Sequence, residues 1–575
     1  MWIRCHLGML GLFTLATFSP ANRATAEKPV VHDRALEIVE YASEPLVVTP
    51  TGIAVARDGR VFVLESHTHF RPEDYDGPPG DRVLILHDRD GDGRADSKTV
   101  FHEGLRYGMD LAFHPDGTLY LATRWAIYRL PDANRDNRAD RLERIIFLQT
   151  PGDYPHNGLS GLAFDPAGRL YFGLGENLGE PYALQGSDGR SFSGGGEGGS
   201  TYRCDALGRN LQRTSTGWWN PFGLAVDSFG RVFGTDNDPG SSPPCRLIDV
   251  FETGNYGYEY RYGRTGLNPL VTWTGDLPGT LPMVSGTGEA PCGIVAYEGG
   301  SFPKQYDGAL IVGVWADHAI EWFPRHDDPG FGLARVDRRV LVRGDNDFRP
   351  VDVAVAPDGS LYFTDWVLAS YALHGRGRVW HLKVRSSKKS SPENAAESDA
   401  LLSRSRDVRE RAAKEMAQTP AGREKLWKVV RDAAHPAARA TALWTLAGLE
   451  PSQRPTNWVA VLTALAEEDA PLSLRALAAR TLGSDWKPRK PRRLPHRLLA
   501  LWLRDHAREV DRETLAAGLA SDDPLLRHAA IEALADPQVG RRWGEALARE
   551  QLWAVLLAAR RGWRVSPNAR RRWIT

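Results

Sequence analysis

One pattern recurs six times in this chain and limits its fold more than any other feature. Each copy has a small residue, an alternating apolar strand, a tight turn of the Asp-Gly kind and a second strand. The copies begin at Thr51, Gly108, Ser160, Phe222, Cys292 and Pro350, about 50 to 70 residues apart. Such a strand-turn-strand unit is a strong local signal for a β-hairpin. Hairpins repeated at this period are typical of propellers.

Further strand-like segments follow the hairpins, for example DRVLILHD, WAIYRLPD, CRLIDV, HAIEWFPR and GRVWHLKV. A hairpin with one or two added strands makes a propeller blade. We therefore predict an all-β six-bladed propeller over 30–385. A strand at 35–41 would close the ring against the last blade and leave no open sheet edge. Two packed β-sandwiches are the alternative, which near-identical hairpins at quasi-regular spacing disfavour.

The composition changes after the propeller. Residues 386–399 form a polar linker rich in Lys and Ser, and beyond it Ala, Leu and Arg recur with helical spacing. Segments such as HPAARATALWTLAGL and DPLLRHAAIEALAD share a helix start, an Arg and an apolar stripe. This predicts an all-α HEAT-like helical repeat domain, a solenoid over 400–575. We expect this solenoid to bind a protein partner through its extended surface.

Charge excludes one class of partner. The chain has 72 basic and 72 acidic residues, so nothing global favours nucleic acid or an anionic membrane. The basic stretch 487–497 reads as a Pro-rich loop between helices, because no aromatic or groove-reading helix accompanies it.

The first 26 residues have the features of a secretory signal peptide. Arg4 supplies the positive region, Leu7 to Phe18 form an apolar core, and Ala24-Thr25-Ala26 fits a cleavage site. An uncleaved anchor is the alternative, but the apolar run is shorter than the ~20 residues of a spanning helix. We expect export to the periplasm or the cell exterior, with no transmembrane span in the mature chain.

Three cysteines remain after this segment, Cys204, Cys245 and Cys292. An oxidising compartment permits a disulfide, and the odd count leaves one thiol over. The spacing does not decide which cysteines pair.

Three segments resemble one superfamily of propeller enzymes. PHNGLSGLAFDPAGRLYFGLGEN, GWWNPFGLAVDSFGRVFGTDNDPG and FRPVDVAVAPDGSLYFTDW are similar, in this order, to segments of the quinoprotein glucose/sorbosone dehydrogenase superfamily. The chain is most similar to the membrane-bound dehydrogenase domain family, which joins such a propeller to helical repeats. The resemblance implies oxidation of a sugar or another alcohol or aldehyde with pyrroloquinoline quinone (PQQ) and Ca²⁺. A separate cytochrome or another acceptor would take the electrons.

The resemblance also implies roles for single residues. His156 matches the general base that removes the proton from the substrate hydroxyl, and Asn157 lies beside it. Asn220 matches an asparagine that touches the cofactor, and Arg349 matches an arginine that pairs with its carboxylates. A neutral imidazole can accept a proton near pH 7 without a metal. The alternative for His156 and Asn157 is a loop cap that bonds neighbouring carbonyls.

The same comparison assigns a metal loop and shows two departures. Asn237, Asp238 and Pro239 match the loop whose carbonyls hold the Ca²⁺ of the cofactor. Trp219 and Val351 stand where the superfamily has arginines. PQQ has three carboxylates, and burying them needs cations or many donors. Trp219 can stack on a planar quinone or a sugar ring, and we include it among the cofactor-binding residues.

Two loops carry a separate calcium pattern. HDRDGDGRAD has acidic residues at alternating positions, with a Gly at the sixth, and its ligands would be Asp88, Asp90, Asp92, the Arg94 carbonyl and Asp96. DANRDNRAD is a weaker copy, with ligands Asp132, Asn134, Asp136 and Asp140. Hard oxygen ligands at this spacing suit Ca²⁺. The alternative is an acidic, solvated turn.

Three functions therefore stand open. The first is a quinoprotein-type dehydrogenase with His156 as base. The second is a propeller that binds carbohydrate or protein without catalysis. The third is a metal-dependent hydrolase of the lactonase type, which would need converging carboxylates, with Glu65, Glu176 and Asp236 as candidates.

Overall fold

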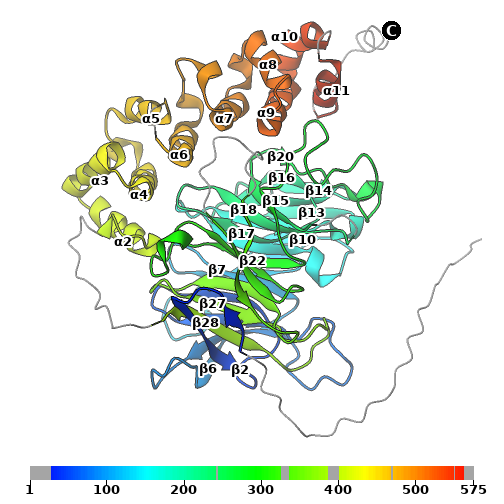
Figure 1. The fold of residues 1–575 in the computed structure, drawn as a ribbon, viewed down its shortest axis with the longest axis vertical. Coiled ribbons are helices and arrows are strands. Elements are labelled where there is room, and N and C mark those ends of the chain that lie inside the picture. The colour runs from blue at the N-terminus through cyan, green and yellow to red at the C-terminus, as the bar shows by residue number, and fades with distance from the viewer. Residues whose placement is uncertain are drawn as a thin grey trace, which may run out of the picture.

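The computed structural model describes residues 28–240, 244–324, 336–385, 400–467, 470–548 and 551–561. The predicted signal peptide at 1–26 and the predicted linker at 386–399 lie outside these residues. Within them, six sheets surround one axis, antiparallel apart from the short β16–β20 pair, and a helical unit follows (Figure 1). The predicted six-bladed propeller with a C-terminal helical region is confirmed. No helix in the described ranges is long and apolar enough to cross a membrane.

The first three blades begin with the first three predicted hairpins. Blade 1 has β3 (Pro50–Val55), β4 (Val61–Glu65), β5 (Asp81–His87) and β6 (Ser97–Leu105). Blade 2 has β7 (Gly108–Phe113), β8 (Leu119–Thr123), β9 (Ala126–Leu130), β10 (Glu143–Gln149), β13 (Tyr182–Gly186) and β14 (Ser191–Gly194). Blade 3 has β11 (Leu159–Phe164), β12 (Leu170–Leu174), β15 (Gly199–Cys204), β16 (Gln212–Trp218) and β20 (Gly254–Asn255).

The last three blades follow the same plan. Blade 4 has β17 (Asn220–Val226), β18 (Val232–Asn237), β19 (Arg246–Val250) and β21 (Ser285–Gly286). Blade 5 has β22 (Pro291–Ala296), β23 (Leu310–Val314), β24 (Ala319–Phe323), β25 (Arg339–Arg343) and β1 (Val30–Val31). Blade 6 has β26 (Pro350–Val355), β27 (Leu361–Asp365), β28 (Arg378–Val384) and β2 (Leu36–Ser43).

Strand β2 closes the ring as predicted. It pairs with β28, from Leu36 opposite Val384 to Ser43 opposite Arg378. A strand near the start of the described chain thus supplies the outer strand of the last blade, so this sheet has no unpaired outer edge at β28.

The hairpin turns define one face of the propeller, and the strand starts define the other. The turns of blades 1, 2 and 6 place Gly59, Gly117 and Gly359 at φ of 90°, 93° and 81°, which explains the Asp-Gly pattern. We call this side the hairpin face. The opposite side, where inner strands begin and second strands end, is here the mouth face.

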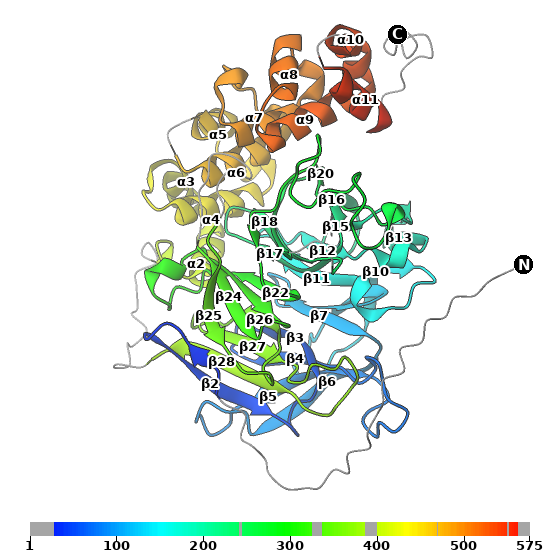
Figure 2. The same ribbon diagram turned by 45° about the vertical axis from the view of Figure 1, so that its right-hand side comes forward.

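The helical unit has α2 (Arg406–Ala417), α3 (Pro420–Asp432), α4 (Pro436–Ala447), α5 (Trp458–Glu467), α6 (Leu472–Leu482), α7 (His496–Asp505), α8 (Arg512–Leu519), α9 (Pro524–Ala535), α10 (Pro537–Ala548) and α11 (Leu552–Arg561). Local sequence sets the helix starts. His435 and Asp523 cap α4 and α9 through their side chains, and a proline follows each cap. The helices form an arc along the propeller (Figure 2).

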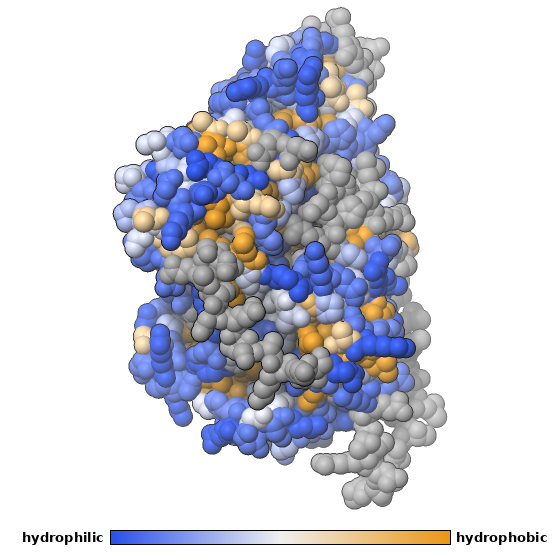
Figure 3. Space-filling model, turned by 60° about the vertical axis from the view of Figure 1, so that its left-hand side comes forward, coloured by the Kyte–Doolittle hydropathy of each residue, from blue (hydrophilic) through white to orange (hydrophobic). Residues whose placement is uncertain are grey.

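The helical unit is docked on the hairpin face. Trp444 donates its Nε1 hydrogen to the Ser228 carbonyl at 3.1 Å, and Arg406 Nη1 donates to the Val226 carbonyl at 2.7 Å. Apolar side chains of blade 4, such as Phe229 and Ile248, belong to the same buried cluster as the helix cores. The propeller therefore occupies part of the surface that we expected to serve a partner. On the side shown in Figure 3, hydrophilic side chains predominate among the coloured atoms.

Candidate functional site

His156 lies on the mouth face, directly before the inner strand of blade 3. It belongs to a single 3₁₀ turn, Pro155–Asn157, that leads into β11. Proline fixes the backbone angle at the first position of this turn. His156 is partly exposed, whereas Asn157 is 1% exposed.

The His156 ring reaches over the axis. It stacks on His69, which follows the second strand of blade 1, with centroids 4.4 Å apart and an interplanar angle of 15°. It meets Tyr371, which follows the second strand of blade 6, edge to face at 4.7 Å. Blade 6 stands opposite blade 3 in a ring of six. A blade 3 side chain that touches residues of blades 1 and 6 must therefore point inward.

The two histidines form a neutral pair. Burial lowers the pKa of His156 to about 4, and burial together with the neighbouring His156 lowers the pKa of His69 well below its usual value. The Nε2 atoms of the two rings are in hydrogen-bond contact. Since Nδ1 of His156 bonds to no described residue, it is the nitrogen left to face a ligand.

Aromatic rings and one guanidinium lie around His156 on the mouth face. Phe70 and Tyr371 are 41% and 42% exposed, large values for such side chains in this fold. The Trp315 ring lies tilted against Tyr371, with centroids 5.2 Å apart and an interplanar angle of 31°, and the Arg349 guanidinium lies 4.5 Å from the Trp315 ring centroid. Arg349 Nη1 donates to the Trp315 carbonyl at 3.2 Å, whereas Nε has no partner. Exposed aromatic faces beside a cation suit a planar, anionic ligand.

A polar cluster lies beside His156 at the junction of blades 3 and 4. Asn157 donates its amide to Glu176, and Asn220 begins the next inner strand. Asn157 Oδ1, Glu176 Oε2 and Asn220 Oδ1 are buried without a hydrogen-bond partner. Gly175 leaves room between them, since a Cβ there would meet Asn220 Oδ1 at 2.6 Å and Asn157 Cα at 2.8 Å. An internal water or a cation would satisfy these oxygens.

Glu176 is the acidic member of this cluster. Burial raises its pKa to about 7, against the lowering effect of nearby backbone amides and Arg264. Sequence reasoning considered Glu176 only for a hydrolase, and its contact with Asn157 is new information from the structure.

The positions without the expected arginines are apolar. Trp219 packs with Tyr258 and Trp273, and Val351 packs with Trp366 and Leu373. Neither can neutralise a carboxylate.

Two other arginines supply charge on the same face. Arg264 is exposed, and its guanidinium lies 6.0 Å from the Trp219 ring centroid. Arg124, fully buried after the second strand of blade 2, donates to Asn177 Oδ1 at 2.8 Å and leaves Nε and Nη1 without partners. Sequence reasoning missed Arg124, Arg264 and His69. The signal for Arg124 and His69 was their position just after a second strand.

The loop expected to hold the calcium of the cofactor begins at the end of β18. Asn237 ends β18, and its Oδ1 accepts from the Cys245 thiol at 3.1 Å. Ligand atoms of Asp238, Cys245 and Glu289 lie within 4.8 Å of one another. Burial raises the pKa of the Cys245 thiol. Asp238 and Glu289 are thus the side chains that could hold a cation here, next to Pro239.

Cys204, Cys245 and Cys292 are buried free thiols.

The first calcium loop, between β5 and β6, has the geometry of an ion-binding turn. Oxygens of Asp88, Asp90 and Asp96 lie within 4.8 Å of one another. Gly91 and Gly93 have φ of 76° and 89°. Asp88 accepts from the amides of both glycines, at 2.8 and 3.0 Å. Asp92 accepts from the Arg94 amide at 2.8 Å, which leaves the Arg94 carbonyl for a ligand role.

The second loop, between β9 and β10, is held by its own hydrogen bonds. Asp132 accepts from the amides of Asp136 and Asn137, and Asp140 accepts from the Ala133 amide at 2.8 Å. Asn134 Oδ1 also accepts from the Asp136 amide, at 3.1 Å. Among the described residues, its acidic oxygens are not found gathered as in the first loop.

The three carboxylates considered for a hydrolase do not share one metal. Glu65 bonds to the Val48 amide and to His67 Nε2, and Asp236 pairs with the fully buried Arg246. Of the three, Glu176 alone has an oxygen without a hydrogen-bond partner.

Comparisons with known proteins found one matching family and several similar solved structures. A family described as Domain of unknown function (DUF7133) matches residues 23–370. No curated protein matches the sequence. Similar solved structures include a putative glucose dehydrogenase from Thermus thermophilus, at 21% identity and a TM-score of 0.43, covering 60% of this chain and 99% of the other. A PQQ-bound aldose sugar dehydrogenase from Streptomyces coelicolor is 18% identical, with a TM-score of 0.41 and coverage of 62% and 100%. A gluconolactonase from Xanthomonas campestris is 13% identical, with a TM-score of 0.38 and coverage of 64% and 98%.

Proposed function

We propose that this chain, which belongs to the family described as Domain of unknown function (DUF7133), has a propeller that acts as a dehydrogenase of the sugar or alcohol type. The site would lie at the mouth face. The substrate would be a sugar or another alcohol or aldehyde. His156 would act as the general base.

The observation that carries this proposal is the position and charge state of His156. Its ring reaches over the axis, and its pKa of about 4 keeps it neutral at physiological pH. A general base must be deprotonated and within hydrogen-bond reach of the hydroxyl proton. His156 meets the first condition, and its Nδ1 is available for the second.

The His69 contact gives the proton a path. If His156 Nε2 donates its hydrogen to His69 Nε2, the lone pair of Nδ1 is free to accept the hydroxyl proton. The resulting imidazolium can release a proton through the same Nε2 contact to His69. His69 would then be a positioning and relay residue, and His156 the catalytic base.

The residues present fit an anionic, planar cofactor such as PQQ, with Arg349 at the position that the resemblance assigned, while Arg264 would stand in for the arginine missing at Trp219. Arg349 and Arg264 would face its carboxylates, and Trp315 or Trp219 would lie against its ring. Arg124 adds a buried positive charge behind them. PQQ, when bound, supplies the quinone that takes up the hydride of the alcohol carbon. Asp238, Glu289 or the Asn157–Glu176–Asn220 cluster would hold the Ca²⁺.

The proposal also covers the location of the protein and its partners. We propose that residues 1–26 direct export to the periplasm or the cell exterior, and that a cytochrome or another separate acceptor takes the electrons. The solenoid surface that faces away from the propeller is the proposed site for a protein partner.

The test uses the purified mature chain with PQQ and Ca²⁺. Calorimetry measures cofactor binding, and dye-linked oxidation is assayed over a panel of sugars and alcohols. We expect turnover that His156→Ala reduces by about 10²-fold or more. His102→Ala, on the outer strand β6, is the matched control and should leave turnover unchanged.

Three outcomes would contradict parts of the proposal. Absence of PQQ binding at micromolar concentration rules out this cofactor. Sugar binding without turnover favours the non-catalytic propeller. Hydrolysis of a sugar lactone that requires a divalent cation favours the hydrolase.

A further inference from the structure

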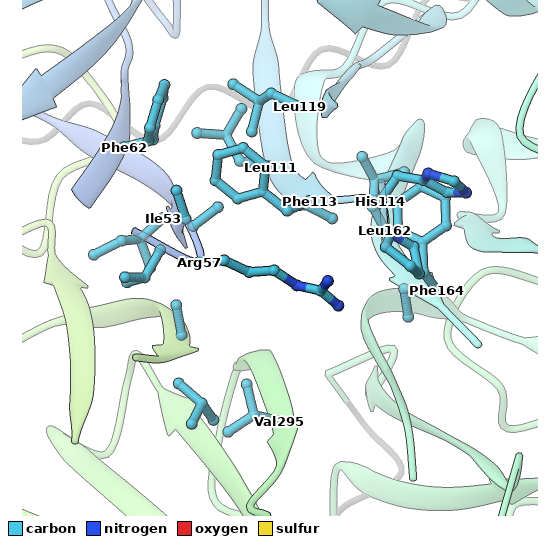
Figure 4. A pocket seen from close by; sticks show the side chains of 18 of the residues that line it. Ile53, Arg57, Phe62, Leu111, Phe113, His114, Leu119, Leu162, Phe164 and Val295 are labelled. Carbon is cyan, nitrogen blue, oxygen red and sulfur yellow. The ribbon is translucent and has the colours of Figure 1, made fainter. Parts of the chain in front are cut away.

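A cavity lies on the hairpin face, away from His156. It has a volume of about 970 Å³ and lies along the propeller axis, between the inner strands and the start of α2 (Figure 4). Each inner strand contributes apolar side chains to its wall, among them Ile53, Leu111, Leu162, Leu224, Ile294 and Val353. Cavities of this size are typical of small-molecule sites.

Two carboxyl groups stand above this apolar wall. The residue that precedes each wall side chain is Gly in blades 1, 3, 4 and 5, but Asp110 in blade 2 and Asp352 in blade 6. Both aspartates line the cavity, one on either side of blade 1, and both are partly exposed. Asp110 accepts from the Leu162 amide at 2.5 Å, and Asp352 accepts from the Ile53 amide at 2.8 Å.

These two aspartates differ from most other acidic groups of the cavity. Asp58, Asp116, Glu298, Asp407 and Glu410 each pair with an arginine or a histidine. No such partner is found for Asp110 or Asp352 in the described part of the chain. Arg57 points into the cavity in Figure 4, but Asp407 at 3.3 Å and Glu410 at 3.5 Å hold its guanidinium at the rim.

The pKa values of Asp110 and Asp352 agree with the lack of a cationic partner among the described residues. Burial raises the pKa of Asp352 to about 7. Burial and the negative charge of Asp352 raise the pKa of Asp110 well above its usual value. Two carboxyl groups that share a poorly solvated site without a cation resist ionisation. A bound cation would lower the free-energy cost of ionising both groups.

We propose that the hairpin-face cavity binds a small organic cation, an ammonium group on an apolar body. The ammonium would lie between Asp110 and Asp352 and donate hydrogen bonds to both carboxylates. The apolar body would contact the six wall side chains. An anion of the same shape would meet the two carboxylates and be excluded.

The test compares three probes of one shape, n-hexylammonium, n-hexanol and n-hexanoate, by calorimetry and thermal shift at pH 8. We expect saturable binding of the ammonium alone. Asp110→Asn with Asp352→Asn should weaken this binding by about tenfold or more, since a charge-assisted hydrogen bond is roughly twice as strong as a neutral one. Asp58→Asn, at the rim and paired with Arg60, is the matched control and should bind normally.

A second variant keeps the test decisive if the double variant folds poorly. Val295→Trp places a large ring at a partly exposed position of the wall and should block the probe. Ammonium binding that both variants leave unchanged, or equal binding of hexanol, overturns the proposal. His156→Ala should retain ammonium binding, which separates this outcome from failure of the dehydrogenase proposal.

Discussion

At the scale of single residues, the mouth face is organised around unpaired groups. Asn157, Glu176 and Asn220 each bury an oxygen without a partner, and Arg124 and Arg349 each bury an unpaired N–H. Buried polar groups are otherwise almost always paired. Their concentration around His156 is the pattern expected where a ligand, an ion or ordered water completes the site.

The first prediction concerns the pH dependence of turnover. Burial holds the pKa of His156 at about 4, so the base stays neutral as pH falls through the usual histidine range. We expect the acid limb of the kcat/KM profile near pH 4 rather than near pH 6.5. An acid limb at the ordinary histidine value would show that His156 is solvated or is not the base.

The same shift bears on stability. A histidine whose pKa is lower in the folded state stabilises the fold fully above its unfolded pKa of about 6.5. This contribution falls as pH drops from about 6.5 toward 4. His156→Ala should therefore flatten the pH dependence of the unfolding free energy in that window, measured by urea unfolding at several pH values.

At the scale of elements, the loop between β5 and β6 gives the clearest ion-binding geometry. Asp88, Asp90 and Asp96 converge, and two glycines adopt the backbone angles of a calcium turn. We predict that Ca²⁺ raises the melting temperature by several degrees through this loop and that chelation reverses the gain. Asp88→Asn should abolish most of the gain. Asp132→Asn, in the second loop, is the matched control, and an equal loss there would assign the ion to both loops.

The inner hairpins could be predicted from sequence because their signals are local. Each Asp-Gly turn and its two strands lie within about 17 residues, and the pattern repeats. The β13–β14 hairpin could not be predicted in the same way. It follows the blade 3 hairpin in sequence but pairs with β10 of blade 2, a choice made by long-range packing.

The site residues also divide into those that local sequence predicts and those whose position depends on long-range packing. The resemblance and the repeat together indicated His156, since it precedes an inner strand. His69 and Arg124 come from loops whose sequences carry no recognisable pattern, and their approach to His156 and Gly158 depends on the closed ring. In the proposed site Arg264 would take the place of the arginine missing at Trp219, and its approach to within 6.0 Å of the Trp219 ring centroid is a contact that local sequence does not show.

At the scale of the whole molecule, one ion-pair cluster joins the two units. Asp249 of β19 accepts a bidentate pair from Arg497 of α7, at 2.7 and 3.0 Å, and a third bond from Arg231 at 2.8 Å. Burial opposes ionisation of Asp249, but the two guanidiniums outweigh it and lower its pKa to about 2. Propeller and helices are therefore expected to unfold together.

The matching prediction is a large cost for breaking this cluster. Asp249→Ala removes the carboxylate that the Arg231 and Arg497 guanidiniums share and should reduce the unfolding free energy by about 3 to 5 kcal/mol, measured by urea unfolding. Glu513→Gln removes an exposed ion pair with Arg492 and should cost less than about 1 kcal/mol. In the native protein, the Asp249 contribution is complete above about pH 4 and is lost as pH falls toward 2. An Asp249→Ala variant as stable as the control would show that this cluster does not help to hold the two units together.

The pairing of Leu36 with Val384 has a consequence for how the protein is made. The ribosome produces β2 first, yet its partner strand emerges only after every other blade. Until then β2 has no partner, and the blade 6 sheet has an open edge that another chain could pair with. The ring can therefore close only once β28 has been made, and until then the unpaired β2 is open to pairing with another chain.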